Sequence, residues 1–329
     1  MTNGLVLGKF MPPHRGHLYL LDFARTFADS LTIVVGSLED EPIPGELRYR
    51  WMQELFPFDR VVHLTDPNPQ YPHEHPGFWA IWKNSLERIC SSKIDLLFAS
   101  EEYGAKLAEV LGARFIPTNA MRESIRVSGT DIRNDPYRHW QEIPRPVRPY
   151  YTRNVVFFGP ESSGKTTLSR ALAESLGALW VPEYARTYLH GREDDFELKD
   201  MEVIARGQWS STQAALRAGY PLVLSDTDAL TTLLWCQELF GQVPPTVSEL
   251  AARERPDLTI LLKPDIPWEE GALRLRPDTR EAFFERCLEA LEEHGREYRV
   301  VGGRRDAREA EARHWLQSLI KKSPPGRAF

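Results

Sequence analysis

The sequence has few of the features that mark secreted, membrane-spanning or nucleic-acid-binding proteins. Its three cysteines, Cys90, Cys236 and Cys287, are far apart and match no metal-ligand spacing, so we expect neither a disulfide framework nor a zinc site. No run approaches the roughly 18 apolar residues of a transmembrane helix, and the N-terminus lacks the apolar core of a signal peptide. A formal net charge of -6 argues against a general affinity for nucleic acid. We therefore expect a cytoplasmic protein without membrane insertion and without a nucleic-acid partner.

The chain also lacks low-complexity sequence, and its 329 residues exceed the usual size of one hydrophobic core. Short apolar runs alternate with amphipathic stretches, a pattern typical of a parallel sheet covered by helices. The segment 134–149 is rich in proline and arginine, which limits regular structure and indicates a connector. We predict an α/β protein with two domains, residues 1–150 including the connector and residues 151–329. Expected strands cover residues 5–10, 31–35, 60–64, 96–100, 113–117, 154–158, 222–226, 258–262 and 298–301, and expected helices cover 18–27, 46–56, 79–90, 105–111, 165–176, 200–217, 228–240, 279–294 and 307–320.

A phosphate-binding loop is indicated in the second half. The sequence Gly-Pro-Glu-Ser-Ser-Gly-Lys-Thr from Gly159 to Thr166 fits the P-loop pattern and stands between an expected strand and an expected helix. That context disfavours the alternative of a simple glycine-rich turn. Backbone N–H groups of such a loop face the phosphates of ATP, Lys165 reaches the β and γ phosphates, and Thr166 ligates Mg²⁺. The predicted phosphate contacts are Gly159, Ser162, Ser163, Gly164, Lys165, Thr166 and Thr167.

Carboxylates that a kinase needs follow two apolar runs. Asp226 ends one run and is placed to hold the metal together with Thr166, whereas a helix-capping role fits Asp228 better. Glu183 follows the other run and is placed to orient or deprotonate an acceptor hydroxyl, with an ion pair to Arg186 as the competing explanation.

Three arginines, Arg274, Arg276 and Arg280, cluster between two expected elements. They fit a cationic lid over the γ phosphate, and they fit a solvated surface equally well.

A second nucleotide site is indicated near the N-terminus. The first expected strand leads into Gly8-Lys9-Phe10-Met11-Pro12-Pro13-His14-Arg15-Gly16-His17, which directly precedes a helix. Two histidines at a helix N-terminus, separated by a glycine, can donate hydrogen bonds to a triphosphate, and the complete H-x-G-H unit disfavours a mere capping histidine. The segment Val127-Ser128-Gly129-Thr130-Asp131-Ile132-Arg133 supplies a second anion cradle, although alone it would indicate only a capping motif. The predicted ATP contacts are Gly8, Lys9, Phe10, His14, His17, Ser128, Thr130 and Arg133.

The order of strand, H-x-G-H and S-x-T-x-x-R resembles the nucleotidyltransferase superfamily. With Pro44-Gly45-Glu46-Leu47-Arg48-Tyr49-Arg50-Trp51, Ser100-Glu101, Tyr103-Gly104, Pro136-Tyr137-Arg138-His139-Trp140, the P-loop and Pro267-Trp268, the chain resembles the NadR family over nearly its whole length. The resemblance implies a Rossmann-like nucleotidyltransferase domain followed by a P-loop kinase domain. It also implies that the second half phosphorylates nicotinamide riboside to nicotinamide mononucleotide (NMN), and that the first half joins NMN to ATP, giving NAD and pyrophosphate.

Residue roles follow from the same resemblance. Trp79 or Trp82 is a candidate for stacking on nicotinamide, because a flat cation suits an indole face, while both also fit as core residues. Catalytic roles are expected for His14, His17, Arg133, Lys165, Glu183 and Asp226; NMN or riboside contacts are expected for Trp79, Trp82, Glu183, Arg186 and Asp228.

The chain departs from the family pattern in two places and leaves several alternatives open. Pro160 stands where relatives tend to have glycine, and Ala185 interrupts a Glu-Tyr-Gly-Arg pattern, but neither change removes a charged group. Because the first strand begins at Leu5, the helix-turn-helix of some relatives is not expected. A fusion acting on a different nucleoside and a nucleotide-sensing regulator without turnover remain alternatives, and a homo-oligomer is neither predicted nor excluded.

Overall fold

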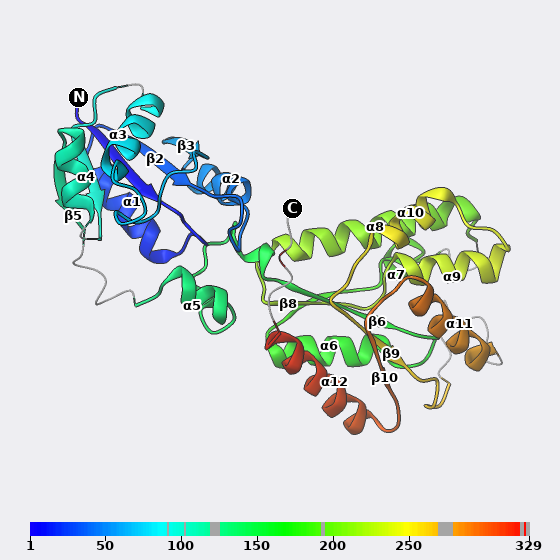
Figure 1. Cartoon of the computed structure of the whole chain (residues 1–329). Helices are drawn as coiled ribbons and strands as arrows, with labels where there is room; N and C mark the ends of the chain where they lie inside the picture. The colour runs from blue at the N-terminus through cyan, green and yellow to red at the C-terminus, as the bar shows by residue number, and fades with distance from the viewer. Residues whose placement is uncertain are drawn as a thin grey trace. The chain divides into compact units, whose positions relative to one another are not determined.

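The structure, a computed structural model, describes residues 1–90, 92–101, 103–118, 126–191, 195–268, 279–322 and 326. Its contacts divide the chain into two compact units, Met1–Arg148 and Pro149–Arg327. Each unit is built on a parallel five-stranded sheet with helices on both faces (Figure 1), so the predicted α/β class is confirmed. None of the helices in these described ranges is long and apolar enough to cross a membrane.

The first unit has the strand order β3-β2-β1-β4-β5. Side chains alternate between the two faces of β1, so Leu5 packs with α3 and α4 while Val6 packs with α1 and α2. Because the order reverses at β1, a crevice forms at the carboxyl ends of the central strands, where ligands bind in open α/β sheets. The elements are β1 (Asn3–Gly8), α1 (Arg15–Phe27), β2 (Ser30–Gly36), α2 (Gly45–Leu55), β3 (Arg60–Leu64), α3 (Phe78–Ile89), β4 (Leu96–Ala99), α4 (Tyr103–Leu111), β5 (Arg114–Pro117) and α5 (Gly129–Asn134).

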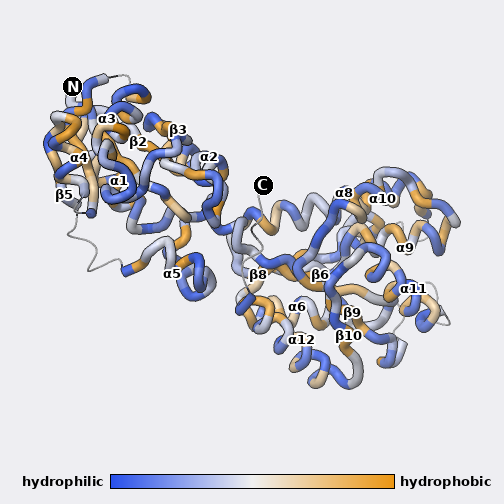
Figure 2. Tube along the Cα trace, viewed as in Figure 1, coloured by the Kyte–Doolittle hydropathy of each residue, from blue (hydrophilic) through white to orange (hydrophobic). Residues whose placement is uncertain are grey.

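The second unit has the strand order β10-β9-β6-β8-β7, with β6 central. Its inner strands are buried along their length and mostly apolar, as expected for a parallel sheet covered on both faces. Their apolar residues appear as orange segments in Figure 2. On β6, Val155 and Phe157 pack with α6 and α12, whereas Val156 and Phe158 pack with α8 to α11. The elements are β6 (Arg153–Phe158), α6 (Lys165–Leu176), β7 (Leu179–Val181), α7 (Tyr184–Tyr188), α8 (Leu198–Arg217), β8 (Leu222–Ser225), α9 (Ala229–Phe240), α10 (Pro245–Arg253), β9 (Leu258–Leu262), α11 (Arg280–Glu293), β10 (Tyr298–Val301) and α12 (Arg305–Ile320).

The predicted strands and helices are present, and their ends differ slightly. Helix α1 begins at Arg15 rather than at residue 18, because the side chain of His14 accepts the N–H of Gly16 and caps the helix. Helix α10 was not predicted, since its apolar positions form a short pattern directly behind two prolines, a place where a proline is compatible with the first turn. The segment 134–149, predicted to be irregular, contains a 3-10 turn at Trp140–Glu142.

Candidate functional site

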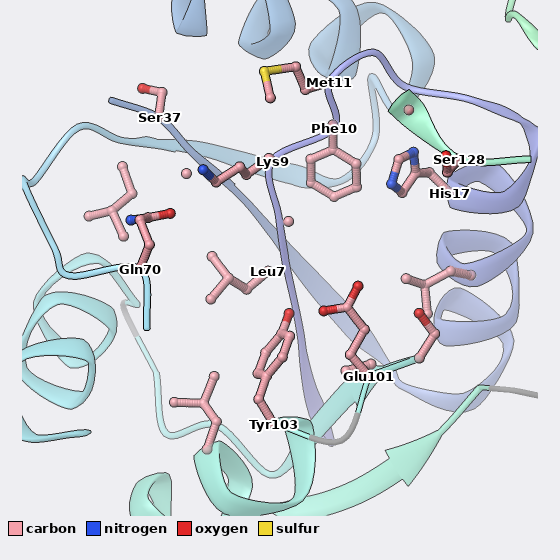
Figure 3. Close-up of a pocket in the computed structure, with 18 of the residues that line it drawn as sticks. Leu7, Lys9, Phe10, Met11, His17, Ser37, Gln70, Glu101, Tyr103 and Ser128 are labelled. Atoms are coloured by element: carbon pink, nitrogen blue, oxygen red, sulfur yellow. The ribbon is translucent and has the colours of Figure 1, made fainter. Parts of the chain in front are cut away.

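A cavity of about 880 Å³ lies at the carboxyl end of β1 in the first unit. Figure 3 shows that its wall combines the loop after β1 with side chains from distant segments, including Gln70, Glu101 and Ser128. The volume is near the upper end of the range of small-molecule sites. All eight predicted ATP contacts line it, namely Gly8, Lys9, Phe10, His14, His17, Ser128, Thr130 and Arg133.

The two histidines of the H-x-G-H unit form a compact pair at the start of α1. Nδ1 of His14 accepts the N–H of Gly16, and Nδ1 of His17 accepts the N–H of His14, each at 3.2 Å. Their ring centroids are 3.7 Å apart. Because Nδ1 acts as the acceptor in both rings, the proton of each neutral imidazole resides on Nε2. The pair therefore offers two Nε2–H donors at the wall of the cavity.

Burial keeps both imidazoles neutral in the ligand-free protein. Desolvation lowers the pKa of His14 to about 4, with Asp131 opposing the shift. Desolvation, and then the neighbouring His14, lower the pKa of His17 well below its ordinary value. A polyphosphate would act in the opposite direction, since an anion next to an imidazole favours the charged form.

The pH dependence of stability follows from this shift at His14. The unfolded imidazole takes up a proton near pH 6.5 and the folded one near pH 4, so stability is lost as the pH falls through this interval. We expect the wild type to lose about 2 to 3 kcal/mol more than His14→Gln between pH 7.5 and pH 4.5. Urea unfolding of both proteins at the two pH values measures this difference, and equal pH dependence would show that His14 is not held neutral.

Helix α5 places Arg133 at the same cavity as the two histidines. Ser128 and Asp131 form a reciprocal capping box at its start, so the capping alternative describes the local geometry of this segment. Arg133 donates to the carbonyl of Met11 and to Oγ1 of Thr130. The close approach needs a glycine at 129, where a Cβ atom would lie 2.4 Å from the same Met11 carbonyl. This contact places Arg133 beside the loop after β1.

An ion-pair network under the cavity was not anticipated from the sequence. Arg48 of α2 is fully buried and donates to the carbonyls of Lys9, Gly36 and Ile43, and it also pairs with Glu41. Glu41 in turn lies 2.9 Å from Nζ of Lys9. The network anchors the loop after β1, and the Lys9 ammonium remains at the cavity wall. Arg48 stands in a segment that carries the family resemblance, but its contacts with distant carbonyls leave no local pattern from which its role could be predicted.

Both tryptophans proposed for nicotinamide lie in α3 and line the cavity. Both also pack against the hydrophobic core between the sheet, α3 and α4, so a contact with nicotinamide and a role in the core are compatible for each of them. Trp82 has an additional structural contact, because its Nε1 donates to the carbonyl of Pro69 at 2.9 Å.

The P-loop of the second unit connects β6 to α6, as its sequence predicts. Gly159 has φ +133°, and a Cβ there would lie 2.7 Å from the carbonyl of Leu262, so this position requires glycine. Nζ of Lys165 donates to the carbonyls of Gly159 and Pro160 at 2.9 and 2.7 Å. Pro160 thus offers its carbonyl to Lys165, but as a proline it has no backbone N–H to donate to a phosphate. Thr167 is exposed on the first turn of α6.

Thr166 and Asp226 meet at the carboxyl edge of the sheet. Oγ1 of Thr166 donates to Oδ2 of Asp226 at 2.6 Å, while Oδ1 of this fully buried aspartate accepts no hydrogen bond from the described part of the chain. Burial, and then Glu183, raise the pKa of Asp226 to about 6. Within the described residues no group of three or more His, Cys, Asp or Glu side chains could hold a metal. The pair nevertheless fits Mg²⁺, which commonly takes one carboxylate, a hydroxyl and phosphate oxygens.

Glu183 stands at the start of α7, beside a pocket of about 70 Å³. Its Oε2 accepts Nε of Arg186 at 2.6 Å, so the ion pair foreseen as the competing explanation is present. The rest of the pocket wall combines aromatic and apolar side chains with polar ones, among them Glu161, Gln208 and Thr227. Trp235 and Phe196 are aromatic lining residues that were not predicted from the sequence. Trp235 belongs to the largely apolar helix α9 and Phe196 precedes α8, so neither position carries a pattern that indicates a ligand contact.

Asp228 does not line this pocket, whereas Glu183, which was also expected to contact the riboside, does. It is fully buried, its Oδ1 accepts the N–H of Thr231 as the N-cap of α9, and its Oδ2 pairs with Arg296. Burial, and then the charge of Asp228, raise the pKa of nearby Glu254. The structure therefore gives both oxygens of Asp228 structural partners and shows the expected cap, and the riboside contact stays a prediction.

The proposed arginine lid lies mostly beyond the described part of the chain. Arg274 and Arg276 fall outside the described residues. Arg280, the first residue of α11, donates to the carbonyls of Ile266 and Ser162, and its guanidinium lies 5.7 Å from the ring centroid of Trp268. In this structure Arg280 therefore holds the P-loop backbone.

Comparisons with known proteins agree with this architecture. The model of a family described as AAA domain matches residues 154–308. Two solved structures superpose on the whole chain at 24% identity: a NadR protein in complex with NAD and AMP-PNP, with a TM-score of 0.79 and 98% of that chain covered, and a NadR protein in complex with NR, with a TM-score of 0.76 and 99% covered. At this identity the two structures establish the fold.

Sequence relatives match either the first part of the chain or most of its length. The nicotinamide-nucleotide adenylyltransferase of Pyrococcus horikoshii is 25% identical over 195 residues, which are 56% of this chain and 100% of that protein. The trifunctional NAD biosynthesis/regulator protein NadR of Salmonella typhimurium (strain LT2) is 30% identical over 318 residues, 90% of this chain and 77% of that protein. The protein of the same name from Escherichia coli (strain K12) is 31% identical over 320 residues, again 90% of this chain and 78% of that protein. Because two NadR proteins at 30% identity or more match 90% of the chain, and the chain carries both nucleotide sites, it belongs to the NadR family.

Proposed function

We propose that the chain is a bifunctional enzyme of NAD salvage. The second unit phosphorylates nicotinamide riboside with ATP to give NMN and ADP, and the first unit transfers the adenylyl group of ATP to NMN, giving NAD and pyrophosphate. The observation that carries this proposal is the presence of two phosphate cradles, each at the carboxyl edge of its own parallel sheet. The named activities of relatives along the whole chain support it. Accordingly, we assign residues 1–150 to the adenylyltransferase and 151–329 to the kinase, in a cytoplasmic protein.

In the first unit, an oxygen of the NMN phosphate attacks the α phosphorus of ATP in line. The bond from that phosphorus to the bridging oxygen breaks, and pyrophosphate leaves. His14 and His17 donate their Nε2–H groups to the polyphosphate, and Arg133 supplies a fixed positive charge, so the leaving group is stabilised as its charge grows. Lys9, held between Glu41 and the cavity, adds a second cation. Trp79 and Trp82 offer indole faces to nicotinamide at the same cavity.

In the second unit, a ribose hydroxyl of the riboside attacks the γ phosphorus of ATP, and ADP leaves. Mg²⁺ held by Thr166 and Asp226 would neutralise charge on the β and γ phosphates. Lys165 binds the same phosphates after leaving its loop carbonyls. Glu183 lies at the small pocket and is placed to accept the hydroxyl proton, while Arg186 orients its carboxylate. The apolar side chains of this pocket, with the indole of Trp235, suit a nicotinamide ring.

Product analysis tests both reactions in one experiment. The purified protein is incubated with nicotinamide riboside, ATP and Mg²⁺, and NMN and NAD are followed by mass spectrometry. We expect NMN to appear first and NAD to follow, with one ADP per NMN and one pyrophosphate per NAD. Parallel incubations with other nucleosides serve as controls. Turnover of another nucleoside in place of nicotinamide riboside, or nucleotide binding without turnover, would contradict the proposal.

A further inference from the structure

Two arginines from outside the P-loop donate hydrogen bonds to the carbonyls of two consecutive loop residues, Ser162 and Ser163. Arg280 donates to the carbonyl of Ser162 at 3.2 Å, and Arg308 donates to the carbonyl of Ser163 at 2.6 Å. Arg308 belongs to α12, which lies along the sheet together with α6 (Figure 1), and it is 145 residues from Ser163 in the chain. The sequence motif of the loop includes neither arginine.

The side chain of Arg308 is buried and all its nitrogens have partners. Nε donates to the carbonyl of Gly303 at 2.8 Å, Nη1 binds Ser163, and Nη2 donates to the carbonyl of Lys263 at 2.9 Å and pairs with Asp265. Asp265 also accepts the N–H of Gly303 at 2.7 Å. One guanidinium thus joins the P-loop to the segments that follow β9 and β10. Such a fork of fixed donors is a property of arginine that lysine lacks.

The contact determines where one P-loop amide points. The peptide between Ser163 and Gly164 is planar, so its C=O and its N–H face opposite directions. With the carbonyl held by Arg308, the N–H of Gly164 faces the other side of the loop, where the amides of a P-loop receive phosphate. Gly164 has φ +88° and no side chain to restrict it, so this peptide can rotate unless an external group holds it.

We propose that Arg308 is a positioning residue for ATP, which presets the Ser163–Gly164 peptide so that its amide faces the phosphates of the kinase site. The inference rests on the proposed kinase function of the second unit. Arg308 does not touch the substrate; it acts through the backbone of the loop. Its loss therefore weakens ATP binding more than riboside binding, and it leaves the first unit unaffected.

The test compares Arg308→Lys with Arg153→Lys. Arg153 is an equally buried arginine of the same unit, paired with Asp257 and bonded to the carbonyl of Lys322, at the opposite end of β6 from the P-loop. For each protein, KM for ATP, KM for riboside and kcat of riboside phosphorylation are measured, together with the melting temperature and the rate of NAD formation from NMN.

For Arg308→Lys we expect KM for ATP to rise about tenfold, because a charge-assisted hydrogen bond to the loop is lost. KM for riboside and the rate of NAD formation should stay within about twofold of the wild type, a change below 0.5 kcal/mol. Arg153→Lys should lower the melting temperature without changing KM for ATP. A wild-type KM for ATP in folded Arg308→Lys overturns the inference, whatever happens to its melting temperature.

Two further measurements keep the test decisive. If Arg308→Lys fails to fold, Asp265→Asn replaces it; a rise of about threefold in KM for ATP supports the inference, and an unchanged KM overturns it. If the wild type phosphorylates no riboside, the proposed function fails separately. Titration of the wild type and Arg308→Lys with ATP and Mg²⁺ then decides, since weaker binding at one of two sites supports the inference and equal binding overturns it.

Discussion

Replacing Lys165 by alanine is expected to reduce NMN formation from nicotinamide riboside by about a thousandfold, because the phosphates lose their mobile cation in the transition state. NAD formation from added NMN should continue at the wild-type rate, since the histidine pair and Arg133 belong to a separate compact unit. Both rates are measured on the same preparation. The two reactions are then separated by a single side chain.

Lys199→Ala provides the matched control for this prediction. Lys199 is an exposed lysine at the start of α8 whose partner is Glu197, and it lies outside the small pocket. Its replacement should leave both rates unchanged. Loss of both reactions in Lys165→Ala would contradict two independent sites, and full kinase activity in that variant would show that the P-loop does not bind the transferred phosphate.

Replacing His17 by alanine is expected to lower NAD formation from NMN by about a hundredfold or more, because one preorganised donor to the leaving pyrophosphate is removed. Riboside phosphorylation should be unaffected. The loss should appear mainly in kcat, since the charge on the leaving group grows in the transition state. Steady-state assays with NMN and ATP measure it.

Two variants separate the donor role from a packing role. His17→Gln keeps a side-chain acceptor for the N–H of His14 and should preserve the start of α1 while remaining impaired in NAD formation. His73→Ala, at an exposed position outside the cavity, should behave as the wild type. If His17→Ala turned over at the wild-type rate, the histidine pair would have only a structural role.

Much of the fold could be predicted because its signals are local. The alternation of apolar strands and amphipathic helices identified both sheets, and the P-loop lies between a strand and a helix as its pattern requires. The N-terminal cradle was harder, since Arg133 lies 122 residues from the carbonyl of Met11 that it contacts. Helix ends depended on caps such as His14, whose ring is an unusual capping group.

Residues that act through long-range contacts could not be predicted. Arg48 and Arg308 are buried and bind backbone carbonyls far away in the chain, and such contacts leave no periodicity or spacing. The cap formed by Asp228 could be predicted from its position before a helix, whereas its pairing with Arg296, 68 residues away, could not. Local patterns therefore identify the phosphate cradles, and tertiary structure identifies the residues that hold them.

The number of adenine nucleotides bound per chain tests the account most directly. Calorimetric titration of the intact protein with a non-hydrolysable ATP analogue and Mg²⁺ should give two sites per chain. Lys165→Ala should weaken one of them and His17→Ala the other. A single site per chain, or one site weakened by both substitutions, would contradict the claim that two separate cradles bind polyphosphate.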